Sequence, residues 1–178
     1  YGLGTESQDL PGFVTIKPPT RVGGAQNYGS AFMPAVYQGT AVGNLNSDVK
    51  DASIGNLSNK SLSSELQRKQ IDLIQSMNRN LRKEKPSDQR IDGVIKSYEL
   101  AYRMQSAAPE ALNVQSESEH TRRLYGLDNG KCKHFAAQCL PARRMIERGV
   151  RYVQIYSGGT ENQRSWDGHS DIKGNHTG

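Results

Sequence analysis

The chain has 178 residues, 34% of them hydrophobic, and its 23 basic and 18 acidic residues give a net charge of +5. Charges of both signs are mixed along the chain, which does not favour a nucleic-acid partner. No run of 18 apolar residues occurs, so no membrane-spanning helix is expected, and only two cysteines are present, too few for a disulfide framework or a zinc site. The length allows one domain with long polar loops.

The first expected element is a short strand in GFVTIKPP, residues 12–19, where β-branched residues alternate before a double proline and the strand ends near Lys17. A long polar loop is predicted over residues 18–60, because this segment lacks a sustained hydrophobic period. A loop of this length is usually either functional or disordered. Its apolar residues leave open a packed excursion beside a site; they are Tyr28, Phe32, Met33 and Tyr37.

A helical region is predicted over residues 61–148. Its first helix, over 61–82, carries one apolar stripe at helical spacing. The stripe consists of Leu62, Leu66, Leu73, Met77 and Leu81. Ser87 or Asp88 can cap a second helix, which the sequence AAPEAL is expected to break near Pro109. A short third helix is expected over 117–124.

The last predicted helix leads into a strand. Apolar residues at helical intervals predict a helix over 133–148, and Gly149 is a natural C-cap. The run RYVQIYS, residues 151–157, then reads as a buried strand, and residues 158–178 read as a polar loop at its carboxyl end. A helix-to-strand unit of this kind indicates an α/β fold, which we interpret as a single partial α/β domain over 1–178.

The final loop contains the densest group of possible metal ligands. The sequence WDGHSDIKGNH holds two carboxylates and two imidazoles within ten residues: Asp167, His169, Asp171 and His176. Zinc, manganese and magnesium accept ligands of these kinds, and sites in open α/β sheets lie at the carboxyl ends of strands. The alternative is a polar loop in which these residues serve as caps and turns.

Cys139 opens a second possible site. The stretch CLPARRMIERG has the Cys-x-Pro-x-Arg outline of the motif in which sulfatases convert cysteine into a catalytic formylglycine. The competing interpretation is a small apolar residue inside a helix. The preceding GKCKHFAAQ reads as helix rather than as a strand ending in paired acids, although Pro141 leaves room for a helix that starts near Cys139. His120 and His134 are expected on the surface.

Several stretches resemble successive landmarks of one bacterial family of uncharacterised proteins. They are YGLGTESQDLPGFV, SYELAYRMQSAAPEAL, RRLYGL, CLPARRMIERGVRYVQIYSGG and SWDGHSDIKGNH. The chain is identified from them as similar to domain-of-unknown-function family 1501, whose members are often labelled sulfatases. The resemblance implies a three-layer α/β/α sandwich of the alkaline phosphatase and sulfatase superfamily, with a mainly parallel sheet. It also implies an interior fragment of a longer, exported protein in the periplasm or outside the cell.

The resemblance implies the chemistry as well. Trp166, Asp167 and His169 match the family's Trp-Asp-x-His, so Asp167 and His169 are expected metal ligands, with His176 as a less certain third. The cofactor would be a divalent ion, namely zinc, magnesium, manganese or calcium. The expected function is metal-dependent hydrolysis of sulfate or phosphate esters, acting on an anionic ester or a sulfated glycan, with the isolated fragment inactive. The alternative is a non-catalytic exported module that binds glycan or protein.

Overall fold

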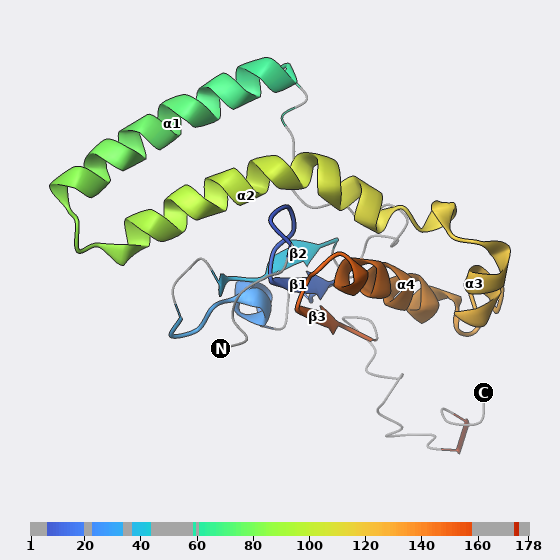
Figure 1. Cartoon of the computed structure of the whole chain (residues 1–178). Helices are drawn as coiled ribbons and strands as arrows, with labels where there is room; N and C mark the ends of the chain where they lie inside the picture. Colours follow the sequence, from blue (N-terminus) through green and yellow to red (C-terminus); the bar gives the residue numbers. More distant parts are fainter. Residues whose placement is uncertain are drawn as a thin grey trace.

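The computed structural model describes residues 7–19, 23–33, 37–43, 59, 61–157 and 173–174. Over these ranges the fold is mixed α/β, with a three-stranded sheet and four α-helices (Figure 1). In chain order the elements are β1 (Phe13–Ile16), the 3-10 helix η1 (Gly24–Tyr28), β2 (Thr40–Val42), α1 (Ser64–Glu84), α2 (Gln89–Leu112), the 3-10 helix η4 (Val114–Ser116), α3 (Glu119–Leu124), α4 (Lys133–Glu147) and β3 (Tyr152–Ile155).

The three strands of the sheet are parallel, as the family resemblance implied. Its order is β2-β1-β3, so the first strand of the chain lies in the middle. Val14 pairs with Thr40 on one side and with Val153 on the other. All three strands therefore end at the same edge. The strand β2 lies inside the segment that was predicted as a loop. It was missed because three residues are too few to show a hydrophobic period.

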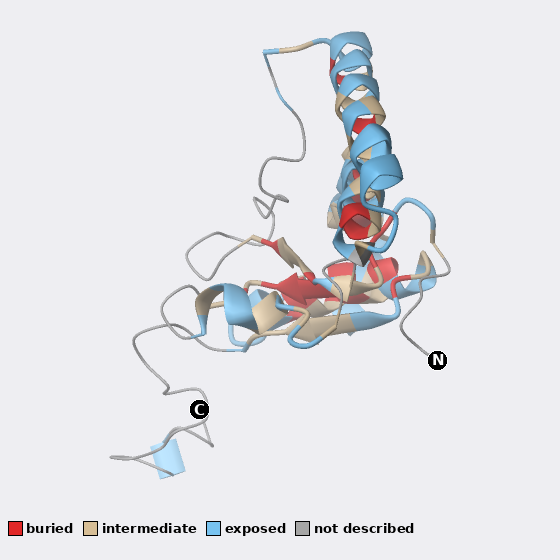
Figure 2. Cartoon of the chain, turned by 90° about the vertical axis from the view of Figure 1, so that its left-hand side faces the viewer, coloured by how far each residue is buried: buried red, intermediate tan, exposed pale blue. Residues whose placement is uncertain are grey.

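The hydrophobic core lies on one face of the sheet, where α2 and α4 pack against it (Figure 2). The strands contribute Val14, Ile16 and Val42, each at most 2% exposed. The helices contribute Met104, Ala108, Ala111, Ala142 and Met145. Burial of these side chains stabilises the fold by about 25 cal/mol for each Å² of apolar surface that is removed from water. This stabilisation holds both helices on this face of the sheet.

The second helix runs through the proline that was predicted to break it. Asp88 caps α2 as expected, since its Oδ1 accepts a hydrogen bond of 3.1 Å from Arg90 N. Pro109 lies exposed within the helix, which continues to Leu112. Ala108 and Ala111 on the opposite side are fully buried. Packing of this side onto the core keeps the last turn helical, although proline removes one backbone donor.

The hairpin of α1 and α2 buries polar side chains between its helices. Gln75, 1% exposed, donates from Nε2 to Ile95 O at 2.8 Å and to Glu99 Oε1 at 3.1 Å. Gln67 accepts at Oε1 from Gln105 Nε2 at 3.0 Å. The helix predicted over 61–82 is confirmed, yet most of its apolar stripe faces away from α2 and is exposed. Side-chain hydrogen bonds therefore contribute to joining the two helices, while these leucines stay exposed.

Helix α4 ends at Glu147, one residue before the predicted end, and Gly149 caps it as predicted. This glycine has a φ of +93°, a left-handed conformation that side chains disfavour. Gly149 N donates to Ile146 O and Val150 N donates to Met145 O, each at 3.0 Å, which is the Schellman pattern. The turn reverses the chain so that Val150 enters the core and β3 pairs with β1.

We predict that Gly149→Ala lowers the free energy of unfolding by about 1–2 kcal/mol, because a Cβ disfavours the left-handed conformation. Urea denaturation followed by circular dichroism measures the change. Gly130→Ala is the matched control, since a Cβ at Gly130 meets no atom within 4 Å and its φ is not positive. Equal stability of the two variants would contradict the role of Gly149.

Candidate functional site at the carboxyl edge of the sheet

The three strands deliver their following residues to one edge, and backbone hydrogen bonds tie these residues together. Lys17 N donates to Val42 O at 2.9 Å, and Tyr156 N donates to Ile16 O at 3.2 Å. Lys17 has a φ of +53°, which is uncommon for a residue with a side chain. Such strained positions cost about 1–3 kcal/mol and gather at functional sites. Lys17 is therefore a candidate binding residue.

Tyr156 adds a polar group beside this edge. Its hydroxyl accepts a hydrogen bond of 2.6 Å from Gln154 Nε2, which fixes the half-buried phenol at the end of β3. An ammonium and a phenolic hydroxyl can both bind an anionic oxygen. Neither Lys17 nor Tyr156 belongs to a recognisable motif in the sequence. The signal that could have identified them as candidate site residues was their position, since each lies at the carboxyl end of a strand.

The predicted metal ligands follow β3 in the sequence. Asp167, His169 and His176 lie outside the described residues, so their assignment as ligands stays a prediction. In the described part of the chain no group of three or more His, Cys, Asp or Glu side chains is placed to hold a metal ion. The described chain reaches Ser157, two residues beyond β3, before the segment that carries these ligands begins.

Cys139 lies in the middle of α4, not at its start. Its side chain is half-buried, and burial raises the pKa of the thiol. A raised pKa disfavours the thiolate, which is the reactive form of cysteine. Pro141 is buried in the same helix and does not begin it. This geometry fits the interpretation of Cys139 as a packed helical residue. His120 and His134 are exposed, as predicted.

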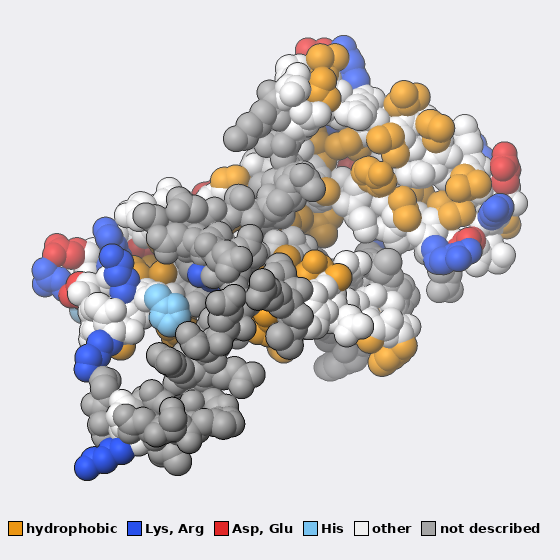
Figure 3. All heavy atoms as spheres, turned by 180° about the vertical axis from the view of Figure 1, so that it is seen from behind, with side chains coloured by type: hydrophobic (Ala, Val, Ile, Leu, Met, Phe, Trp, Pro, Cys, Tyr) orange, Lys and Arg blue, Asp and Glu red, His pale blue; other side chains and the backbone are white. Residues whose placement is uncertain are grey.

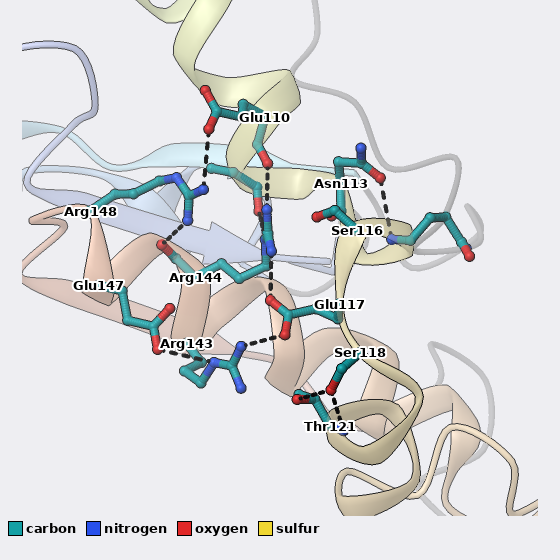
Figure 4. Close-up of polar contacts among 12 residues, drawn as sticks. Glu110, Asn113, Ser116, Glu117, Ser118, Thr121, Arg143, Arg144, Glu147 and Arg148 are labelled. Atoms are coloured by element: carbon teal, nitrogen blue, oxygen red, sulfur yellow. Dashed lines mark hydrogen bonds and ion pairs between the residues drawn. The ribbon is translucent and has the colours of Figure 1, made fainter.

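A buried arginine joins α4 to the end of α2 (Figure 4). Arg144 is 7% exposed, and its Nε donates to Ala111 O at 3.0 Å while Nη2 donates to Glu110 O at 2.9 Å. Its Nη1 lies 2.5 Å from Glu117 Oε1. The last carbonyl groups of a helix lack partners within the helix, and Arg144 supplies donors for two of them. Arg144 therefore serves the fold, because three of its five N–H donors hold α2 and Glu117 in place.

Glu117 is shared between two arginines. Arg143 Nη2 lies 2.8 Å from Glu117 Oε2, and its guanidinium stacks 5.4 Å from the ring centre of Tyr125. Hydrogen bonds from Arg143 and then from Arg144 hold the pKa of Glu117 below its usual value. Adjacent arginines on a helix, such as Arg143 and Arg144, can bind an anion or form a solvated face. The structure instead pairs both with a carboxylate.

The fold and this edge define a class of protein: a mixed α/β chain with a parallel sheet and polar groups where the strands end. The chain belongs to DUF1501, a family of proteins of unknown function whose model matches residues 1–178. No curated protein and no solved structure matches the chain. None of the helices in the described ranges combines the length and apolar character needed to cross a membrane.

We predict that Glu117→Gln lowers the free energy of unfolding at pH 7 by about 2 kcal/mol, because two arginines lose a charged partner. Since folding lowers the pKa of Glu117, this carboxylate stabilises the fold above its ordinary pKa near 4.5, and the stabilisation is lost as the pH falls through the lower folded value. The variant should thus lose less stability than the wild type on acidification below pH 4.5.

Urea denaturation at a series of pH values measures both effects. Glu119→Gln is the matched control, because Glu119 is an exposed carboxylate on α3 whose ion pair with Arg123 is open to solvent. Its loss should change stability by less than about 0.5 kcal/mol. An equal loss in the two variants, or an unchanged acid dependence in Glu117→Gln, would contradict the role of Glu117.

Proposed function

We propose that this DUF1501 protein is a metal-dependent hydrolase of sulfate or phosphate esters, with its site at the carboxyl edge of the sheet. The observation that carries the proposal is the parallel sheet. Its three strands end together, and the segment with Asp167 and His169 follows β3 directly in the sequence. Ligands of open α/β sheets bind at this edge. The proposal includes a three-layer α/β/α sandwich of the alkaline phosphatase type and a periplasmic or extracellular location.

The donor set suits a divalent ion. A carboxylate from Asp167 and imidazoles from His169 and His176 are ligands that zinc and manganese accept, whereas magnesium and calcium would favour the carboxylate. Such an ion polarises a sulfuryl or phosphoryl oxygen. Asp167 and His169 would hold the ion in this proposal, and His176 would complete or support the set.

The substrate proposed for this site is an anionic ester, either a small molecule or a sulfated glycan. A net charge of +5 gives the chain a mild attraction for anions. Lys17 and Tyr156 lie at the edge where such a group would bind, and each can donate a hydrogen bond to an anionic oxygen. These two residues would orient the ester while the ion acts on it.

We predict that Asp167→Asn and His169→Ala each weaken divalent-metal binding at least about 10-fold and abolish metal-dependent ester hydrolysis in the full-length protein. Elemental analysis and titration calorimetry measure the metal, and a panel of aryl sulfates and aryl phosphates measures turnover. His120→Ala is the matched control, because it removes an exposed imidazole from α3. Full esterase activity in Asp167→Asn, or absence of bound metal in the wild type, would reject the assignment.

A non-catalytic binding module is the second candidate, and one observation favours it. Phe32, in the aromatic segment that begins after η1, is 97% exposed. An exposed aromatic ring is a common contact for a sugar or a protein partner. In this alternative the residues from Tyr28 to Tyr37 bind a glycan or a protein, and the histidine segment is structural.

The two candidates predict different effects of Phe32→Ala. Under the binding-module alternative, this change weakens glycan binding about 10-fold, as expected for loss of a stacking ring, and no ester is turned over. Under the hydrolase proposal, metal-dependent turnover is sustained and survives the change. A glycan array, combined with the ester panel in the presence and absence of added metal, separates them.

A further inference from the structure

The α1–α2 hairpin presents a group of apolar side chains to solvent. Figure 3 shows hydrophobic side chains gathered over this hairpin. Four of them come from α1 and two from α2, and each is 41–64% exposed: Leu66, Leu73, Met77, Leu81, Val94 and Tyr98. Surfaces of this kind mark interaction sites when they form a patch. We call these six residues the hairpin patch.

The hairpin patch does not hold the hairpin together. Gln75 and Gln67 make the hydrogen bonds between α1 and α2. Arg68 adds an ion pair of 3.1 Å to Glu99 and lies 4.9 Å over the ring of Tyr102. The leucines therefore remain available for a different contact, and the chain would gain apolar burial by covering them.

The patch along α1 is uncharged. Gln70 lies on the helix between Leu66 and Leu73, and the adjacent charged residues already have partners: Lys69 Nζ lies 2.7 Å from Glu65 Oε1, and Arg68 pairs with Asp72. An uncharged face brings no like charges together when it meets an identical face. A strongly charged partner, such as nucleic acid or an anionic membrane, would find no complementary charge here.

The spacing of the patch is nearly symmetric along the helix. Leu66 and Leu81 lie at its ends, and Leu73 lies midway between them. An antiparallel copy of α1 therefore brings Leu66 of one chain beside Leu81 of the other and the two Leu73 side chains close to the twofold axis. Such a self-complementary contact is the usual geometry of a homodimer.

We propose that two copies of this protein associate face to face through the hairpin patch, with their α1 helices antiparallel, to form a four-helix bundle. A helix of 21 residues is about 31 Å long, and two adjacent helices are about 20 Å wide. The contact thus covers about 600 Å² on each copy, or about 1,200 Å² in total, which reaches the lower end of specific interfaces. This association is independent of the chemistry proposed at the sheet edge.

Sedimentation velocity tests the association with the wild-type chain up to about 100 µM, since contacts of this size reach micromolar affinity. The expected result is a species of twice the 19.7 kDa of one chain. The double variant Leu73→Glu, Met77→Glu should weaken association at least about 100-fold, because it brings four carboxylates together in the dimer. Both side chains are 64% exposed, so the substitutions leave the monomer core intact.

The matched control is the double variant Arg79→Gln, Lys83→Gln. It changes the net charge by the same −2 and alters two exposed residues of α1 outside the patch. It should associate as the wild type does. Far-UV circular dichroism on both double variants confirms that the helices form. A wild-type monomer at the highest concentration, or a Leu73→Glu, Met77→Glu variant that still dimerises, would overturn the proposal.

Cysteine cross-linking tests the antiparallel arrangement. In a Cys132→Ser, Cys139→Ala background, a mixture of Leu66→Cys and Leu81→Cys chains should form a disulfide between the two kinds of chain under mild oxidation. Leu66→Cys alone should not cross-link, because the two copies of that position lie about 22 Å apart, beyond the Cα separation of about 7 Å that a disulfide spans. Self-cross-linking of Leu66→Cys would reject the antiparallel contact.

Hydrogen exchange on the full-length protein distinguishes a second copy from other possible occupants of the hairpin patch. Protection of α1 that appears only as the protein dimerises supports the proposal. Protection of α1 in a monomeric full-length protein would overturn it, since another segment of that protein would then cover the patch. Binding of α1 to neutral phosphatidylcholine vesicles without any self-association would overturn it in favour of a lipid surface.

Discussion

Parallel pairing of β1 on both of its sides is the constraint on which the rest of this fold depends. A parallel neighbour requires the chain to return to the opposite end of the sheet before it pairs again. Between β2 and β3 this return is made by the helices, and α2 and α4 bury the face of the sheet that they cross. The same constraint brings all three strand ends to one edge. A shared edge for Lys17 and Tyr156 is thus a consequence of topology.

The second determinant is the junction around Arg144. One guanidinium donates to two carbonyls of α2 and pairs with Glu117, so it connects the end of one helix, the link after it and the body of α4. A buried charge of this kind requires all its partners, because desolvation is costly when one is missing. This junction also holds α4, the helix that leads into β3, against the end of α2.

Local signals predicted most element positions correctly. The caps at Asp88 and Gly149 and the strands near residues 12–17 and 151–157 all follow from residue chemistry that acts within a few positions. The predicted end of α2 was wrong, because burial of Ala108 and Ala111 outweighs the local effect of Pro109. Asp167 and His169 are proposed as ligands because of their residue chemistry and the family resemblance. The structure adds that they follow a strand of the parallel sheet in the sequence.

The sequence by itself determined the α/β class, the order of the four α-helices with β1 and β3, and the family, since periodicity, caps and motifs are local properties of the chain. Only the tertiary structure decided which face each helix presents. The leucines of α1 predict a buried stripe, yet Gln67 and Gln75 occupy the inside of the hairpin and the leucines face solvent. The reason is that helical spacing defines a stripe, whereas hydrogen bonds such as Gln75 to Ile95 decide which side of the helix meets its neighbour.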